Sequence, residues 1–346
     1  MTTTSYAPEE ITFSFPSPEE MALGIPQTHE SFQFVANARK NFEAILSGID
    51  DRLVLIVGPC SVHDERALLE YAVRLKCLSE EVSKRFFVIL RAYFEKPRTT
   101  IGWKGFLYDP YLDGSYDIET GLRKTRKLLA QISEMELPVG SEILELTTFP
   151  YYADFLTWGC IGARTSSSPP HRQIVASLPF PVGFKNTIEG NVDIPIQGIV
   201  SAASSHVYLG LGEDGQMTRK YGEGNPSCHL VLRGSENRPN YHPKDVELSA
   251  QECARAGVAQ KILIDCSHDN CFKKAKEQLP AFHSVISQVQ ERNPNILGLM
   301  LESNLFGGNQ PLSDNLQYGI SITDPCLDFA TTEELIRTAY DKFDHV

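Results

Sequence analysis

Short apolar runs alternate with amphipathic stretches along this chain, and that alternation most narrowly limits its fold. Nine runs are predicted to be strands: 54–58, 87–91, 139–142, 161–164, 182–185, 206–211, 230–233, 262–265 and 297–302. Most are continuously hydrophobic, as are strands covered on both faces. Helical periodicity fills the intervals, as in 64–84, where Asp64 is placed to cap, and in 119–135. A strand and a helix repeated about eight times favour a (β/α)8 TIM barrel.

Residues with reactive or ionisable side chains stand at the C-terminal ends of these runs. Eight of the nine end at or just before an ionisable residue or cysteine, namely Cys60, Arg91, Glu142, Arg164, Lys185, Arg233, Asp265 with His268, and Glu302. The exception, 206–211, enters a glycine-rich stretch, so we assign it to an inserted β-hairpin at about 206–221, outside the barrel. Barrel enzymes place their sites at the C-terminal face. No GxGxxG sequence opens a helix after the first strand, which weakens a Rossmann alternative.

The length of 346 residues allows two ordinary domains or one large barrel. We expect a catalytic barrel over 51–346, preceded by an N-terminal extension over 1–50. This extension is proline-rich at first and helix-like over 32–46. It either covers the barrel or serves regulation or subunit contact, and the sequence leaves both open.

Composition excludes several classes of protein. With 44 acidic and 32 basic side chains the net charge is −12, which argues against nucleic-acid binding. No apolar run is long enough to cross a bilayer, and the N-terminus lacks the features of a secretory signal. Eight cysteines without a CxxC pair indicate reduced thiols, so we expect a cytoplasmic protein. Any anionic ligand therefore needs a local basic pocket.

Basic residues gather at the predicted barrel mouth: Arg91, Lys96, Arg98, Lys104, Arg164, Lys185 and Arg233. Burying several cations is costly unless anions compensate them, which favours a ligand with two phosphates or a phosphate and a carboxylate. The densest segment, 95–105, reads EKPRTTIGWKG, and its Arg98, Thr99 and Thr100 resemble a phosphate clamp. An ordinary surface turn is the alternative, although Trp103 in this flexible frame favours closure over a ligand.

A second set of residues has the kinds of side chain that are typical of a metal site. Cys60, His268, Glu302 and Asp324 combine a thiolate, an imidazole and two carboxylates, which suit a divalent ion such as Mn, Fe, Zn or Co. Spacing alone is weak support, because each residue taken singly is better explained by a structural role. His63 and His171 are rival imidazoles that we rank lower, since neither follows a strand end.

Several long motifs carry a family resemblance. They include GPCSVHD at 58–64, RAYFEKPRTTIGWKG at 91–105, GARTSSS at 162–168, PVGFKN at 181–186, LRG at 232–234 and DCSH at 265–268. In these motifs, over about 28–340, the chain resembles the type I 3-deoxy-D-arabino-heptulosonate 7-phosphate (DAHP) synthases. The resemblance implies a barrel with an N-terminal extension and an inserted hairpin. It also implies condensation of phosphoenolpyruvate with erythrose 4-phosphate and water, which yields DAHP and phosphate in the first step of the shikimate pathway.

The same resemblance implies roles for individual residues. Cys60, His268, Glu302 and Asp324 stand where the family holds its metal. Phosphoenolpyruvate would be bound by Arg91, Lys104, Arg164, Lys185 and Arg233, with Glu142 nearby and Asp265 orienting His268. Lys96 would face the aldehyde, while Arg98 and Thr99 would hold the phosphate of erythrose 4-phosphate. Lys96, Cys60 and His268 form the predicted catalytic group.

Outside the active site the sequence departs from well-studied members. The hairpin region 211–220 reads LGEDGQMTRK, and Pro179 stands where the phenylalanine-sensitive type has serine. An aromatic amino acid effector remains expected as a family trait, with Pro179, Tyr208, Gly210 and Lys220 as effector-region residues. A homodimer or homotetramer is expected as well.

Three alternatives stay open at this point. A related synthase would use another aldose phosphate, such as arabinose 5-phosphate, although the KPRTT loop and the extension argue against it. A Schiff-base aldolase would use Lys185 as its nucleophile. A catalytically inactive regulatory paralogue is disfavoured by the full cationic and metal set.

Overall fold

The computed structural model describes residues 15–98 and 100–344, and its strands close into a parallel barrel. The barrel order is β1-β2-β3-β4-β5-β8-β9-β10, and β10 pairs with β1 to complete the ring. Its strands are β1 (Leu53–Gly58), β2 (Phe86–Arg91), β3 (Val139–Glu142), β4 (Trp158–Ile161), β5 (Val182–Lys185), β8 (Cys228–Leu232), β9 (Ile262–Asp265) and β10 (Ile296–Asn304). This closed ring confirms the predicted (β/α)8 barrel. A two-residue strand, β11 (Leu327–Asp328), pairs in parallel with the C-terminal end of β10.

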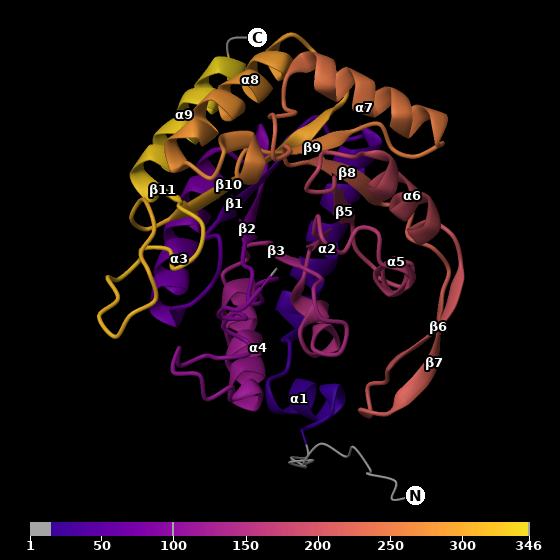
Figure 1. Ribbon diagram of the computed structural model, residues 1–346, viewed down its shortest axis with the longest axis vertical. Helices are drawn as coiled ribbons and strands as arrows, with labels where there is room; N and C mark the ends of the chain where they lie inside the picture. The colour runs from indigo at the N-terminus through magenta and orange to yellow at the C-terminus, as the bar shows by residue number, and fades with distance from the viewer. Residues whose placement is uncertain (1–14, 99, 345–346) are drawn as a thin grey trace, which may run out of the picture.

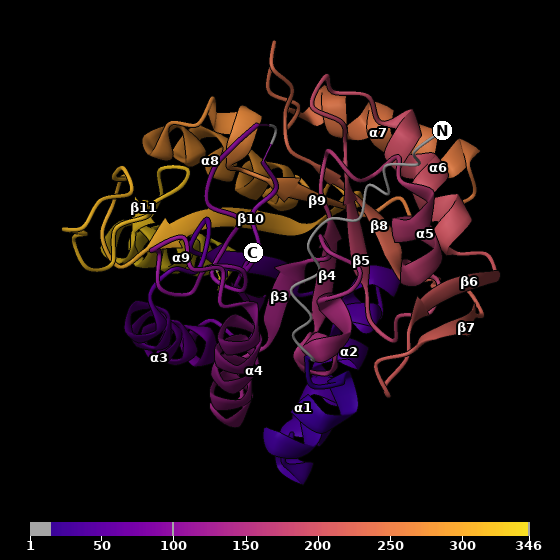
Figure 2. The ribbon, with the colours of Figure 1, turned by 60° about the horizontal axis from the view of Figure 1, so that its bottom comes forward.

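Helices surround these strands in both ribbon views (Figures 1 and 2). They are α1 (Pro18–Gly24), α2 (His29–Ser47), α3 (Glu65–Glu81), α4 (Ile118–Glu134), α5 (Pro169–Val175), α6 (Asp193–Ala202), α7 (Pro243–Arg255), α8 (Gln278–Gln290) and α9 (Phe329–Asp344). Short 3-10 turns lie at Phe149–Tyr151, Ala153–Phe155, His268–Cys271 and Ala275–Glu277. The Asp64 carboxylate accepts from the backbone N–H groups of Arg66 and Ala67, as its predicted capping role requires. None of the helices within these described ranges is long and apolar enough to span a bilayer.

Side chains alternate between two cores along the strands. Leu55 and Val57 of β1 face outward into the cluster shared with the helices, whereas Val54 and Ile56 face into the barrel. Phe42 of α2 belongs to the interior cluster together with Ala38 and Ile45 of the same helix. Part of the N-terminal extension therefore packs on the barrel interior and leaves the opposite, C-terminal end for the site.

One predicted strand was misplaced. The fourth strand is Trp158–Ile161, whereas the expected range of 161–164 lies almost entirely beyond it. The chain turns at Gly162, whose carbonyl accepts from the N–H groups of Thr165 and Ser166. A Cβ at Gly162 would lie only 2.3 Å from Glu142 Oε1, so a larger residue there would displace the Glu142 carboxylate. Arg164 consequently lies in the turn past the strand.

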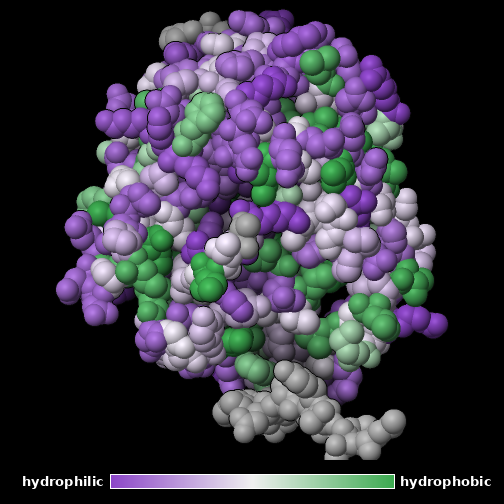
Figure 3. Space-filling model, viewed as in Figure 1, coloured by the Kyte–Doolittle hydropathy of each residue, from purple (hydrophilic) through white to green (hydrophobic). Residues whose placement is uncertain are grey.

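The inserted hairpin lies outside the barrel, as predicted. β6 (His206–Leu211) and β7 (Met217–Gly222) form a separate antiparallel ribbon at the right of Figure 1. The N–H of Glu19 in α1 donates to the Glu213 carbonyl in the hairpin turn, at 2.9 Å. On the outer face the hydrophobic side chains of Val207, Leu209, Met217 and Tyr221 are exposed. Hydrophobic residues accordingly gather at the lower right of Figure 3.

Candidate active site

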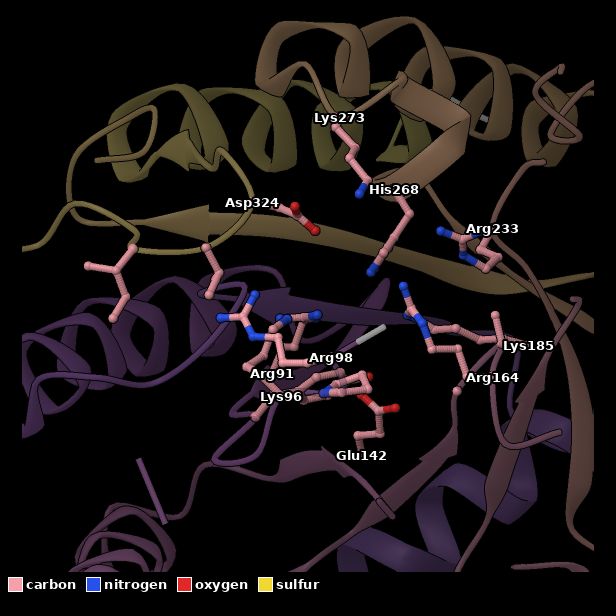
Figure 4. A pocket seen from close by; sticks show the side chains of 16 residues that line it. Arg91, Lys96, Arg98, Glu142, Arg164, Lys185, Arg233, His268, Lys273 and Asp324 are labelled. Carbon is pink, nitrogen blue, oxygen red and sulfur yellow. The ribbon is translucent and has the colours of Figure 1, made fainter. Parts of the chain in front are cut away.

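A cavity of about 330 Å³ opens at the C-terminal ends of the barrel strands. Side chains from several strand ends and loops converge on it in Figure 4. Its charged lining consists of Arg91, Lys96, Arg98, Glu142, Arg164, Lys185, Arg233, His268, Lys273 and Asp324. Cations thus outnumber carboxylates here, although the chain as a whole carries a net charge of −12. The local basic pocket that the composition required is present.

Three cations gather on one side of this cavity. Figure 4 shows Arg164, Lys185 and Arg233 close together, on the side away from Asp324. The Lys185 ammonium donates to Asp265 Oδ2 at 2.8 Å, and Arg233 Nη1 forms an ion pair with Asp269. Forked guanidinium donors beside an ammonium are well suited to phosphate oxygens.

The Asp265 carboxylate is engaged on both oxygens by other residues of this chain. Its Oδ2 lies 2.8 Å from both Lys185 Nζ and His268 Nδ1, and its Oδ1 accepts from the Ser267 N–H and hydroxyl. Burial by itself would raise the pKa of Asp265, but the charges of His268 and Lys185 hold it well below the usual range. In this geometry Asp265 orients Lys185 and His268.

Arg91 is completely buried and holds other site residues in place. Its Nη2 donates to Glu302 Oε1 at 2.8 Å, and its Nη1 donates to the carbonyls of Pro59 and Cys60. The guanidinium lies 3.8 Å from the centre of the Tyr93 ring. Among the described residues its buried Nε has no hydrogen-bond acceptor. Arg91 therefore fixes Glu302 and the Cys60 backbone, in addition to the contact with substrate that we expect from the sequence.

The Lys96 side chain points toward Cys60, one of the predicted metal ligands. Its ammonium lies 3.2 Å from both the carbonyl oxygen and the Sγ of Cys60. Burial opposes its charge, but Cys60, Glu302 and Asp324 together raise the pKa of Lys96 above its ordinary value. Lys96 is therefore a protonated donor beside the predicted metal ligands.

Three of the four predicted metal ligands lie together. One ligand atom from each of Cys60, Glu302 and Asp324 lies within 4.8 Å of the others. His268 stands beside this group, with its Nε2 3.7 Å from Glu302 Oε1 and its Nδ1 turned to Asp265. Burial and the nearby Glu302 carboxylate raise the pKa of the Cys60 thiol. A thiolate with two carboxylates and a neighbouring imidazole is a donor set that fits a divalent transition ion.

The loop after β2 divides its predicted residues between two cavities. Lys104 lines an adjoining cavity of about 260 Å³ with Glu95 and Tyr108, so the structure does not bring Lys104 to the main cavity with the other cations. The Lys104 carbonyl accepts from the Lys96 N–H, and the Lys104 ammonium lies 5.7 Å from the centre of the Tyr108 ring. Arg98 lines both cavities and is exposed, with its Nε donating to the Trp103 carbonyl at 2.7 Å. Thr99 lies outside the described residues.

The other aromatic and histidine candidates are structural. Trp103 is buried and donates from its Nε1 to the Asp109 carbonyl at 3.0 Å, so it packs within the protein and does not cover the cavity. The ring nitrogens of His171 face the Ser168 hydroxyl and the Leu144 carbonyl. Neither His171 nor His63 lines the main cavity.

The sequence analysis missed Tyr93 and Lys273, both of which line the main cavity. Tyr93 lies two residues past the end of β2, and this position relative to a strand end could have revealed it. Lys273 gave no such signal. It reaches the cavity through left-handed backbone at His268, Phe272 and Lys273, with φ of 57°, 49° and 54°. Residues other than glycine rarely adopt this backbone conformation, so the sequence did not indicate that Lys273 reaches the cavity.

A second cavity, of about 300 Å³, lies between the hairpin and α1 and α5. All four predicted effector-region residues line it: Pro179, Tyr208, Gly210 and Lys220. The wall is mostly apolar, including Leu146, Phe149, Pro150, Ile174, Leu178 and Leu211. At one side the hydroxyls of Ser177 and Tyr208 share a hydrogen bond of 2.6 Å.

Comparison with known proteins settles the family. The sequence profile of the DAHP synthetase I family matches residues 27–337. The chain belongs to this family.

Relatives of this family member cover nearly its whole length. The Tyr-sensitive phospho-2-dehydro-3-deoxyheptonate aldolase of Escherichia coli K12 is 41% identical over 93% of this chain and 91% of its own. The Trp-sensitive enzyme of the same organism is 41% identical, with 93% of each chain covered. A solved structure of this aldolase from Francisella tularensis SCHU S4 has a TM-score of 0.94 at 38% identity, covering 96% of this chain and 97% of its own. The chain is accordingly an enzyme of the phospho-2-dehydro-3-deoxyheptonate aldolase class.

Proposed function

We propose that this family member condenses phosphoenolpyruvate with erythrose 4-phosphate and water to form DAHP and phosphate. One observation carries the assignment of substrates. The main cavity has Arg164, Lys185 and Arg233 on one side, and Arg98 and Lys96 also line it, with the Lys96 ammonium 3.2 Å from Cys60 Sγ. Such a cavity offers cations for two anionic groups and a proton donor beside the predicted metal ligands.

The three clustered cations would hold the phosphate of phosphoenolpyruvate. Ion pairs with Asp265 and Asp269 keep Lys185 and Arg233 oriented before substrate arrives. Donors fixed in this way stabilise charge on a departing phosphate without reorganising. Arg98, which is exposed at the edge, would hold the phosphate of the aldose.

Cys60, Glu302 and Asp324, with His268 beside them, would hold a divalent ion, which supplies positive charge for polarising a carbonyl oxygen. Lys96 then donates a proton to the aldehyde oxygen as C3 of phosphoenolpyruvate bonds to that carbon. Water then adds at C2 and the C2–O bond to phosphate breaks, so that one proton of the water restores the Lys96 ammonium and the other leaves with the phosphate. A protonated ammonium 3.2 Å from Cys60 Sγ is suited to this general-acid step.

The Schiff-base alternative is disfavoured by the surroundings of Lys185. An amine must be unprotonated to attack a carbonyl, whereas the Lys185 ammonium is 4% exposed and lies 2.8 Å from the Asp265 carboxylate. Lys185 is thereby held as a hydrogen-bond donor to Asp265 and is not free to attack a carbonyl.

Chelation and metal add-back test the proposed reaction. The protein is assayed with phosphoenolpyruvate and erythrose 4-phosphate before and after treatment with a chelator, and then with Mn, Fe, Zn or Co restored. We expect activity to be lost and then recovered. Activity that survives complete metal removal, or a preference for arabinose 5-phosphate, would refute the assignment.

We further propose that the second cavity binds an aromatic amino acid inhibitor. Its apolar wall suits an aromatic ring, while Lys220 and Glu213 offer opposite charges to the carboxylate and ammonium of the ligand. Pro18 of α1 also lines the cavity, which gives this part of the N-terminal extension a regulatory role. Inhibition assays and calorimetry with Tyr, Phe and Trp test the proposal, and absence of binding by all three would refute it.

We also propose a homo-oligomer. The exposed apolar side chains on the outer face of the hairpin, including Leu209 and Met217, support it because a second copy would cover them. Sedimentation velocity of the wild type and of Leu209→Lys tests this, and a wild type that stays monomeric at micromolar concentration would refute it.

A further inference from the structure

Glu95 is a buried carboxylate to which the proposed reaction gives no role. It is 2% exposed and directly precedes Lys96 in the loop after β2. Three donors converge on it from another part of the chain. The Thr148 hydroxyl donates to Oε1 at 2.6 Å, the Tyr152 hydroxyl to Oε1 at 3.2 Å, and the Glu145 N–H to Oε2 at 3.1 Å. Both carboxylate oxygens are therefore engaged.

These donors all belong to the segment that follows β3. Backbone bonds anchor the start of the loop, where the Ala92 N–H donates to the Gly140 carbonyl and the Val62 N–H donates to the Tyr93 carbonyl. At Phe94 and Lys96 the backbone bonds are local: the Lys96 N–H donates to the Lys104 carbonyl, and the Leu107 N–H donates to the Phe94 carbonyl. They close the loop on itself. The Glu95 side chain, together with contact between the Phe94 and Tyr152 rings, instead fixes this loop to its neighbour.

The position of Lys96 depends on that attachment. Its ammonium lies 3.2 Å from Cys60 Sγ at the end of a long, flexible side chain that begins one residue after Glu95. Catalytic groups lose much of their effect when displaced by about 1 Å. A shift of the loop away from the segment at 145–152 would therefore move Lys96 out of reach.

We propose that Glu95 is a positioning residue: through Thr148, Tyr152 and the Glu145 backbone it holds Lys96 against Cys60 for proton donation. This inference rests on the proposed function. The ionised carboxylate performs the task better than the acid, since it accepts all three hydrogen bonds whereas the acid form must donate from one oxygen.

The electrostatic surroundings of Glu95 support the proposal. Burial raises the pKa of Glu95 to about 7, while hydrogen bonds from Thr148 and Tyr152 oppose the rise. The Glu145 carboxylate and the Tyr152 and Tyr108 phenols face it, and Lys96 and Lys104 line the adjoining cavity. Glu95 therefore changes charge near neutral pH, and its hold on the loop strengthens as pH rises through about 7.

Glu95→Gln tests the proposal, because glutamine keeps the shape but turns an amide toward one of the donors. We expect kcat to fall about 10-fold or more, with the KM for phosphoenolpyruvate within about twofold and the melting temperature nearly unchanged. The rise of kcat through about pH 7 should disappear with it. Thr148→Val should lower kcat less, because it removes one of the three hydrogen bonds. The losses in the double variant should be less than additive, since both residues act through the same attachment of the loop.

Glu145→Gln is the matched control. Its side chain lines the same adjoining cavity and bears on Glu95 through its charge, but its hydrogen bond to Glu95 is made by the backbone N–H, which the variant keeps. We expect near-normal kcat. Glu95→Gln with normal kcat, or with kcat reduced only alongside a lower melting temperature and a higher phosphoenolpyruvate KM, would overturn the proposal.

Wild-type turnover, measured in parallel, separates the two claims. A wild type that does not turn over these substrates refutes the proposed function. A crystal structure of Glu95→Gln still tests the positioning itself: Lys96 displaced from Cys60 supports it, and an unchanged distance overturns it.

Discussion

The main cavity and the second cavity have similar volumes, about 330 and 300 Å³, but opposite characters. Charged residues from the ends of the barrel strands and their loops line the first. The second is lined largely by apolar side chains from the hairpin, α5 and the segment after β3, with Lys220 and Glu213 as its charges. The strand ends hold groups that act on anions, whereas the elements added around the barrel form a site suited to recognising an aromatic ring. Substitutions should therefore separate turnover from inhibition.

The largest expected effect is on turnover at the main cavity. Lys96→Met should lower kcat about 10³-fold, because it removes the proposed proton donor beside Cys60. Lys104→Met is the control, since Lys104 lines the adjoining cavity, and it should change kcat far less. Steady-state kinetics with both substrates measure this. A larger loss in Lys104→Met than in Lys96→Met would contradict the roles given to the two lysines.

A second change should affect stability as well as turnover. Lys185→Met leaves the buried Asp265 carboxylate without one of its cations, which should cost about 3–5 kcal/mol of unfolding free energy. It also removes a phosphate ligand. Lys185 helps to hold the pKa of Asp265 well below its ordinary value of about 4. The loss should therefore be greatest near neutral pH and shrink as pH falls from about 4 toward the lowered pKa of the folded wild type.

Chemical denaturation at several pH values measures this difference in unfolding free energy. Lys244→Met is the control, because its ion pair with Glu247 is exposed and worth at most about 1 kcal/mol. Equal losses in the two variants would show that burial of the Lys185–Asp265 pair does not matter.

The next prediction concerns the second cavity alone. Lys220→Met should weaken inhibition by the aromatic amino acid about 10-fold or more, because it removes a charged partner of the ligand carboxylate. Turnover without inhibitor should stay normal. Arg219→Met changes an exposed residue one position earlier and is the matched control. This variant should be inhibited by the aromatic amino acid as strongly as the wild type. Inhibition curves decide the matter, and a drop in uninhibited kcat would show that the two cavities are not separable.

The smallest effect is expected at the hydroxyl pair of the second cavity. Tyr208→Phe removes the hydrogen bond to Ser177 but keeps the ring, so inhibitor affinity should fall about 2- to 10-fold. Isothermal calorimetry measures the change. A loss as large as that in Lys220→Met would mean that the tyrosine hydroxyl, and not the lysine charge, dominates recognition.

The sequence indicated much of the fold because the barrel strands are buried on both faces and therefore appear as short apolar runs. Its one misplaced strand arose at Gly162, where the apolar character continues past the strand while the chain already turns. The helix α1 and the strand β11 were not predicted, since they are only 7 and 2 residues long and carry little periodicity.

The site was indicated less completely. Motifs and strand ends placed Cys60, Glu302 and Asp324 in one set, and the structure brings them within 4.8 Å. The same reasoning put Lys104 with the main cations, but its side chain lies over the Tyr108 ring and lines the adjoining cavity. Lys273 depended on left-handed backbone at three residues, which residue type does not signal.

The sequence by itself determined the barrel, the face that carries its chemistry and the residue types available there. These features follow from local rules: periodicity, burial of strands, and the common direction of parallel strand ends. Only the tertiary structure decided which side chains contact one another. The attachment of Glu95 to Thr148, 53 positions later, and of Arg91 to Glu302, 211 positions later, depends on how the closed barrel brings distant segments into contact.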